Sequence, residues 1–154
     1  MIFKKKKSSI LSEESVQVGL TTENKSEAIQ RAGQALLEAG FIDEQYIKGM
    51  HLREEVATTY IGSSVAIPHG TNEHKKYVKE TGIVILQYPD GVDFGNGNIA
   101  KLVIGIAAKG EEHIEILMTI ADAVSDQAVL DKLTKTDSAK KLFTILMQKG
   151  FGDK

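Results

Sequence analysis

The chain has 154 residues, of which 19 are basic and 21 acidic, so its formal net charge is −2. A near-neutral chain lacks the basic excess that drives sequence-independent binding to nucleic acid, and no nucleic-acid partner is expected. It contains no cysteine, which excludes disulfide scaffolds, thiol catalysis and iron–sulfur clusters. Its length and its hydrophobic content of 42% are typical of one globular domain with a substantial core.

The first ten residues predict a basic, flexible extension, followed by a single domain over residues 11–150. Residues 4–7 are lysines and begin like a signal peptide, but serines and glutamates interrupt the apolar stretch that should follow. No apolar run approaches the ~20 residues that a membrane-spanning helix needs. We therefore expect a cytoplasmic protein without membrane insertion, and the lysine run is interpreted as a solvated chain end rather than a membrane contact.

The first third of the chain predicts one short strand and two helices. Residues 16–18 alternate like an edge strand. Asn24 and Glu27 have the spacing of a capping box, and apolar residues then recur at helical spacing until Gly40. Asp43 is the expected N-cap of a second helix that ends near residue 55. The apolar face of this second helix is expected to comprise Tyr46, Ile47 and Met50.

The middle of the chain changes to the pattern of buried strands. Residues 65–67 predict a short strand that ends at Pro68, and residues 83–86 and 102–107 form unbroken apolar runs. Such runs are typical of strands that are covered on both faces.

Two turns are expected in this region. Tyr88-Pro89-Asp90-Gly91 predicts a turn because proline fixes φ and glycine accepts a positive φ. Gly95-Asn96-Gly97-Asn98 predicts another, with a minor strand at residues 92–94 between them.

The last third of the chain predicts three helices. The first begins near Glu111, a short second one surrounds Leu130, and Asp137 is the expected N-cap of the third. The apolar face of the first of these helices is expected to comprise Ile114, Leu117, Ile120, Ala121 and Val124. Helices thus flank the strand region on both sides in sequence, which predicts an α/β fold: a single layered domain with a mixed, largely parallel β-sheet flanked by helices.

His69 is the first candidate functional residue. Pro68 fixes φ and has no N–H, so the strand should end there, and Gly70 lets the chain turn sharply. His69 would then stand at the carboxyl end of a strand, where open α/β sheets bind ligands. At pH 7 its imidazole is mostly neutral, so one ring nitrogen carries a free lone pair. The spacing alone supports a functional histidine and an ordinary surface-turn histidine equally.

The other three histidines carry weaker signals. His113 falls in the first turn of a predicted helix, where the helix dipole and free N–H groups could bind phosphate oxygens, although its spacing alone favours a plain boundary residue. His51 and His74 are expected at solvated surface positions. A metal site built from His69, His113 and an acid stays open, but no motif in the sequence requires one.

Several segments resemble, in the right order, enzyme IIA of the sugar phosphotransferase system, of the mannitol/fructose type. Residues 60–62 and Val65-Ala66-Ile67-Pro68-His69-Gly70-Thr71 resemble the phosphorylation-site motif of that family. Four further segments resemble the mannitol branch in particular: residues 82–84, 87–92, 102–108 and 112–114. The similarity covers residues 11 to 147, so residues 11–150 are identified as an enzyme IIA domain of type 2.

The resemblance implies a phosphocarrier. The phosphohistidine carrier protein HPr would donate a phosphoryl group to His69, which would pass it to a cysteine of the mannitol enzyme IIB component and so drive coupled uptake and phosphorylation of mannitol. Arg53 matches by position the family's active-site arginine, and His113 matches its second active-site histidine. No cofactor or metal is implied, since phosphohistidine is the donor. The IIB and IIC components of the permease are expected on a separate chain.

The residue types suit this chemistry. A neutral imidazole nitrogen is a competent nucleophile, and in-line phosphoryl transfer depends mainly on positioning and charge stabilisation. Arg53 can offer a planar fork of donors to phosphoryl oxygens, and His113 can add a hydrogen bond and, if protonated, a charge.

Three alternatives stay open. The sugar could be fructose or another polyol. The domain could be a regulatory module of the same fold, in which phosphorylation of His69 changes the binding of a regulator. The histidines could instead serve a metal-dependent hydrolase.

Overall fold

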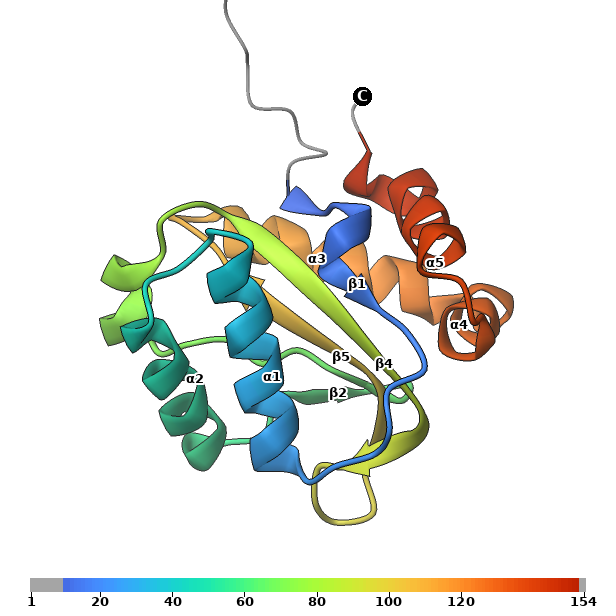
Figure 1. Ribbon diagram of the computed structural model, residues 1–154, viewed down its shortest axis with the longest axis horizontal. Helices are drawn as coiled ribbons and strands as arrows, with labels where there is room; N and C mark the ends of the chain where they lie inside the picture. The colour runs from blue at the N-terminus through green and yellow to red at the C-terminus, as the bar shows by residue number, and fades with distance from the viewer. Residues whose placement is uncertain (1–9, 153–154) are drawn as a thin grey trace, which may run out of the picture.

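A mixed β-sheet separates two layers of helices in the computed structural model, which describes residues 10–152 (Figure 1). Within these residues the sheet has five strands in the order β1-β4-β5-β3-β2. The strands are β1 (Val16–Gln17), β2 (Tyr60–Gly62), β3 (Val65–Ala66), β4 (Gly82–Asp93) and β5 (Ile99–Ala107). β1 pairs with β4 and β3 with β5 in parallel, whereas β2–β3 and β4–β5 are antiparallel. The predicted mixed α/β sheet is confirmed, although its longest ladder, β4–β5, is antiparallel.

The helices cover both faces of the sheet. α1 (Lys25–Glu38) and α2 (Gln45–Val56) lie on one face, and α3 (Glu112–Ser125), α4 (Gln127–Lys135) and α5 (Ala139–Leu146) lie on the other (Figure 1). In β4, Val84 and Leu86 belong to the core beneath α1 and α2, whereas Ile83 and Ile85 belong to the core beneath α3, α4 and α5. Successive side chains of a strand point to opposite faces, which explains why the apolar runs are unbroken.

The predicted start of α1 is confirmed. Asn24 Oδ1 accepts the backbone N–H of Glu27 at 2.8 Å, and Glu27 Oε1 accepts the backbone N–H of Asn24 at 3.1 Å. This reciprocal capping box satisfies two of the donors that a helix start leaves without partners.

Two other predicted N-caps are wrong by one residue. α2 begins after Glu44 rather than Asp43, and no side chain caps it, since Glu44 already has helical φ and ψ. α5 is capped by Ser138 rather than Asp137, because Ser138 has the extended backbone of a cap residue and its hydroxyl accepts the N–H of Lys141 at 3.0 Å.

The turn predicted at residues 88–91 is also wrong, because β4 continues through them. The ladder with β5 shifts register between Gln87 and Val92, Pro89 is exposed, and Gly91 has a φ of 83°. Pro89 has no backbone N–H and Gly91 has a positive φ. Both properties suit an interruption of the β4–β5 ladder as well as they suit a turn that reverses the chain. The expected minor strand at 92–94 is the end of β4.

The reversal between β4 and β5 lies at Gly95–Asn98, as predicted. Phe94 N–H donates to the Asn98 carbonyl at 2.7 Å, and Asn98 N–H donates to the Gly95 carbonyl at 2.9 Å. The positive φ values that this turn needs are supplied by Gly95, Asn96 and Gly97.

α3 begins where the sequence predicts, but its buried face is rotated. The side chains it buries are Ile116, Ile120, Ala123 and Val124. Ile114, expected in the core, is 56% exposed, and Ala121 is exposed as well. Residues 114 and 116–118 are all apolar, so two overlapping stripes fit the helical period and packing against the sheet selects one of them.

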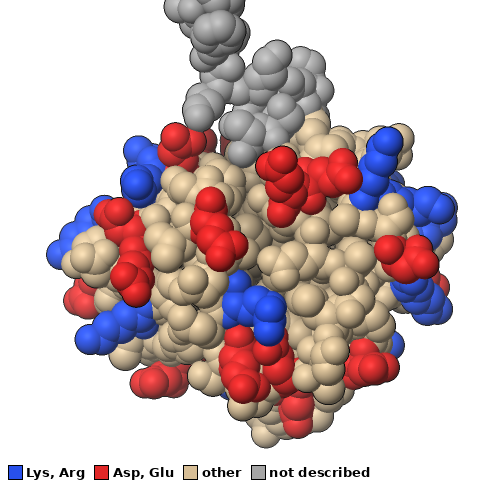
Figure 2. All heavy atoms as spheres, in the orientation of Figure 1, with Lys and Arg blue, Asp and Glu red and all other residues tan. Residues whose placement is uncertain are grey.

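Basic and acidic side chains are interspersed over the face shown in Figure 2, in keeping with the net charge of −2. Within residues 10–152, no helix has the length and apolar character needed to cross a bilayer. The basic extension expected at residues 1–10 lies, apart from Ile10, outside the described residues.

Candidate functional site

His69 stands just beyond β3, at the carboxyl end of that strand, as the sequence predicts. It forms a parallel bridge with Ile106 of β5, whose N–H donates to the Pro68 carbonyl at 3.0 Å. A Cβ at position 70 would lie 2.6 Å from a ring carbon of Tyr46, so Gly70 is required for the chain to pass that ring. The Tyr46 hydroxyl accepts the Gly70 N–H at 2.8 Å and donates to the Ile106 carbonyl at 2.9 Å. Burial raises the pKa of Tyr46 to about 12, so the hydroxyl keeps its proton.

The tautomer of His69 follows from one hydrogen bond. Nδ1 lies 2.7 Å from the Ile67 carbonyl oxygen, which can only accept, so Nδ1 carries the hydrogen. The remaining ring nitrogen, Nε2, therefore holds the lone pair. Burial lowers the pKa of His69 and outweighs the opposing effect of the Ile67 carbonyl. The ring is thus neutral at pH 7, with Nε2 as its nucleophilic atom.

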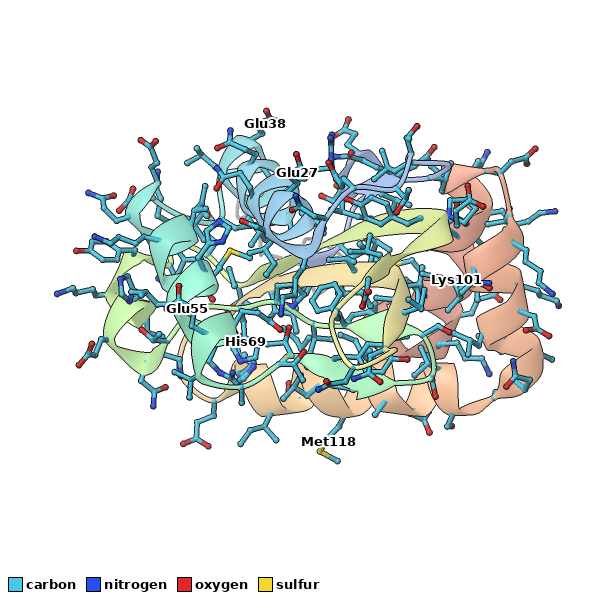
Figure 3. The ribbon with its side chains drawn as sticks, turned by 90° about the horizontal axis from the view of Figure 1, so that it is seen from below. Glu27, Glu38, Glu55, His69, Lys101 and Met118 are labelled. Carbon is cyan, nitrogen blue, oxygen red and sulfur yellow. The ribbon has the colours of Figure 1, made fainter. Side chains whose placement is uncertain are left out.

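The backbone that holds His69 is tied to a buried carboxylate on α2. Glu54 accepts the Thr59 N–H at 3.0 Å and the Thr59 hydroxyl at 2.6 Å. The Thr59 carbonyl in turn accepts the Ile67 N–H at 3.0 Å, and the Ile67 carbonyl accepts from His69. A continuous chain of hydrogen bonds therefore leads from Glu54 to the imidazole. The labelled His69 side chain is visible in Figure 3, beside the carboxyl-terminal part of α2.

His113 is the second residue of α3 and lies against His69. Their ring centroids are 4.8 Å apart and the planes are tilted by 53°. Within the described structure, His113 Nε2 is buried and has no hydrogen-bond partner. Burial, followed by the charge that His69 would carry if protonated and by the positive charges of Lys75 and Arg53, lowers the pKa of His113 to about 4. His113 is therefore neutral at pH 7 in the unphosphorylated protein. The positive charge that a protonated His113 would add is absent in this state.

Arg53, in the last turn of α2, completes the predicted set. Its guanidinium donates to the Ala57 carbonyl at 2.6 Å. Arg53, His69 and His113 line one cavity of about 250 Å³. The structure thus brings all three predicted residues together, although they come from elements far apart in the sequence.

The same cavity is lined by further residues that were not predicted as site residues. They are Tyr46, Val56, Gly70, Thr71, Asn72, Lys75, Ile106 and Ala108. Lys75 is the most telling of them, because it is a cation. Nothing in the stretch Glu73-His74-Lys75-Lys76 distinguishes it from Lys76, so its place is a consequence of the fold alone. Among the described residues that line the cavity there is no carboxylate.

The other two histidines lie outside the cavity lining, and both are half-buried rather than fully solvated. His74 Nδ1 is 2.7 Å from the Thr71 hydroxyl, and His51 Nε2 is 3.0 Å from Gln30 Oε1. Across residues 10–152, no three histidine, aspartate or glutamate side chains are arranged to hold a metal ion.

Two solved structures that share this fold are mannitol enzyme IIA domains. The crystal structure of IIA mannitol from Escherichia coli has a TM-score of 0.83 and 40% identity, covering 88% of this chain and 98% of that one. The complex of enzyme IIAMTL with phosphorylated enzyme IIBMTL from the same organism has a TM-score of 0.86 and 39% identity, covering 90% of this chain and 97% of that one.

Sequence comparison points the same way. The mannitol-specific phosphotransferase enzyme IIA component of Geobacillus stearothermophilus is 46% identical over 137 residues, covering 89% of this chain and 94% of the relative. The mannitol-specific EIICBA component of Vibrio cholerae is 47% identical over 138 residues, and this chain spans 21% of its length. Residues 9–149 match the model of the family described as phosphoenolpyruvate-dependent sugar phosphotransferase system, EIIA 2. The chain belongs to this family.

Proposed function

We propose that the protein is a phosphocarrier that accepts a phosphoryl group from phospho-HPr on Nε2 of His69 and passes it to a cysteine of a mannitol enzyme IIB. The observation that carries this proposal is the hydrogen bond of 2.7 Å from His69 Nδ1 to the Ile67 carbonyl, which leaves Nε2 as the nucleophile in the cavity. Family membership supports the reaction class.

The transfer can be written bond by bond. The Nε2 lone pair attacks phosphorus, the new N–P bond forms, and the N–P bond of the donor phosphohistidine breaks. Because the Ile67 carbonyl holds the proton on Nδ1, the phosphorylated ring retains imidazolium character, which makes it a good leaving group. Attack by the acceptor thiolate then forms an S–P bond as the Nε2–P bond breaks.

Arg53 and His113 have separate roles in this proposal. A bound phosphoryl group adds a charge of about −1.5 to −2 at pH 7, and the Arg53 guanidinium can pair with two of its oxygens. His113 Nε2, which has no partner among the described residues, is the kind of buried polar atom that a phosphoryl oxygen would satisfy. His113 is neutral before the phosphoryl group arrives, so at that stage it offers a hydrogen bond.

The surroundings of the cavity suit transient protein partners. Val56 lines the cavity and is 80% exposed, and Ile114 follows His113 directly and is 56% exposed. Met118, one turn further along α3, is 67% exposed, and Figure 3 shows it pointing away from the sheet. Exposed apolar side chains beside a reactive group are typical of a surface that a partner covers.

Mannitol as the sugar rests on relatives whose names specify it. Fructose or another polyol and a regulatory role for the phosphorylated protein are the competing outcomes. The proposal places the protein in the cytoplasm, where a carrier supplied from phosphoenolpyruvate would operate.

Reconstitution tests the proposal. The protein is mixed with phosphoenolpyruvate, enzyme I and HPr, then with membranes that contain mannitol or fructose IIBC permeases. We expect an acid-labile, base-stable phosphoryl group on the wild type and on the control His51→Ala, none on His69→Ala, and phosphorylation of mannitol. Normal labelling of His69→Ala would remove His69 as the acceptor, and labelling without transfer to any permease would favour the regulatory role.

A further inference from the structure

We infer that Lys75 is a phosphoryl-binding residue, whose ammonium group contacts the phosphoryl group on His69 and shares its charge with Arg53. This inference rests on the proposed function and assigns a residue to the same cavity. Three observations carry it: the path of the chain after His69, the anchoring of the ammonium group, and the charges around the cavity.

A short 3-10 helix brings Lys75 back to the cavity. The helix η3 (Asn72–Tyr77) begins directly after Thr71, whose hydroxyl accepts the His74 N–H at 3.2 Å. Gly49 of α2 packs against the His74 ring so closely that a Cβ there would lie 2.4 Å from it. η3 is therefore fixed at its start and along its side, and Lys75 lines the cavity with His69, Arg53 and His113.

The ammonium group of Lys75 is anchored beside His113. Nζ donates to the Gly110 carbonyl at 3.1 Å, and Gly110 lies in the loop that leads into α3. Lysine has three N–H donors, so this one bond leaves donors for phosphoryl oxygens. In the part of the chain that the structure describes, no carboxylate forms an ion pair with Lys75. Within residues 10–152, its positive charge is therefore not neutralised by an ion pair.

The charge of a phosphoryl group calls for a second cation. A phosphoryl group carries about −1.5 to −2 at pH 7, whereas Arg53 supplies a single positive charge. His113 does not supply the second one before transfer, since burial and its positive neighbours lower its pKa to about 4 in the unphosphorylated protein. Among the described lining residues, Lys75 is the other side chain with a full positive charge. Arg53 and Lys75 together offer two positive charges to the phosphoryl oxygens, beside the imidazolium ring that carries the group.

Lys76 provides a matched control. Both lysines are exposed on η3, but Lys76 Nζ lies over the Tyr77 ring, 5.5 Å from its centroid, and does not line the cavity. Lys75→Met and Lys76→Met therefore remove the same charge from the same helix. Wild type, both variants and Lys75→Arg are phosphorylated with phosphoenolpyruvate, enzyme I and HPr over a range of phospho-HPr concentrations. The second phosphate pKa of the product is measured by ³¹P NMR.

We expect Lys75→Met to slow phosphorylation at saturating phospho-HPr about tenfold or more, as the loss of a charge-assisted hydrogen bond should, and Lys76→Met to change it by less than about twofold. Lys75→Met should also raise the second phosphate pKa, because a contacting cation stabilises the dianion, and Lys75→Arg should restore both properties in part. Matching melting temperatures will show that the variants are folded.

Two results would overturn the inference. Equal effects of Lys75→Met and Lys76→Met would mean that only the net charge matters. A change confined to the phospho-HPr concentration at half-maximal rate, with an unchanged phosphate pKa, would assign Lys75 to docking. Failure of the proposed function is distinguishable, since the wild type would then acquire no label on His69.

Discussion

The imidazole rings of His69 and His113 lie with their centroids 4.8 Å apart. His69 follows β3 and His113 follows β5, at the same end of the sheet. β3 and β5 run parallel, so the residues that follow them meet at their common carboxyl ends. Burial lowers the pKa of each ring, and a charge on His69 would lower that of His113 further. The pair is therefore neutral at pH 7 and suited to a nucleophile with a neutral neighbour.

The first prediction concerns the pH dependence of stability. The folded-state pKa of His113 is about 4, below the ~6.5 of an unfolded histidine, so the unfolded state binds the proton first as the pH falls. His113 thus leaves the unfolding free energy unchanged above pH ~6.5 and lowers it progressively as the pH falls from ~6.5 to about 4. Urea denaturation of wild type and His113→Asn should show a smaller loss of unfolding free energy over this range in the variant. If the unfolding free energies of the two proteins fell in parallel over this pH range, the lowered pKa of His113 would be contradicted.

A second prediction tests the hydrogen-bond chain from Glu54. Glu54→Gln replaces a carboxylate that accepts from both Thr59 donors with an amide whose NH2 cannot accept. We expect the unfolding free energy to fall by about 1–3 kcal/mol and the phosphorylation of His69 to slow, because Thr59 holds Ile67. The exposed neighbour provides the control, Glu55→Gln, which should change neither. Full transfer activity in a destabilised Glu54→Gln protein would show that the chain does not position His69.

The third prediction concerns the Tyr46 hydroxyl. Tyr46→Phe leaves the buried Ile106 carbonyl and the Gly70 N–H without this partner, so we expect a loss of about 1–3 kcal/mol in unfolding free energy and slower transfer. Tyr77→Phe is the matched control, since no hydrogen bond of its hydroxyl occurs within the described structure. Denaturation and transfer kinetics of both variants provide the measurement, and equal behaviour of the two would refute the role.

Gln87 should separate stability from transfer. It is fully buried, its Oε1 accepts the Gly19 N–H at 2.8 Å, and its Nε2 donates to the Leu133 and Thr136 carbonyls at 2.9 and 2.7 Å. Gln87→Met removes all three bonds far from the cavity lining, so the unfolding free energy should fall by several kcal/mol, at about 1–3 kcal/mol per unsatisfied group. The transfer rate of the folded fraction should stay within about twofold of wild type. A much slower rate would mean that the site depends on this distant network.

The site could be predicted from the sequence where its chemistry is local. Pro68 and Gly70 fix the end of the strand around His69 whatever the rest of the chain does, and the run at 83–86 has to be covered on both faces. The resemblance added Arg53 and His113 by position. The cavity then joins the three residues, which a single sequence without the resemblance would not have paired.

The parts that could not be predicted depend on packing between distant segments. Pro89 and Gly91 lie where the β4–β5 ladder shifts register, although the same two residues are equally typical of a turn. Lys75 differs from Lys76 in its surroundings only because η3 packs on α2 and directs Lys75 to the Gly110 carbonyl. Glu54 is one of two adjacent glutamates, and its burial is decided by the return of Thr59 to α2.

The central claim is that Nε2 of His69 carries the phosphoryl group. The most direct measurement is ¹⁵N–³¹P NMR of the protein labelled with ¹⁵N-histidine, after phosphorylation by phosphoenolpyruvate, enzyme I and HPr. We predict one phosphorus signal coupled to Nε2 of His69, with the hydrogen retained on Nδ1. Coupling to Nδ1 of His69, or a phosphoryl group on any other residue, would contradict the account.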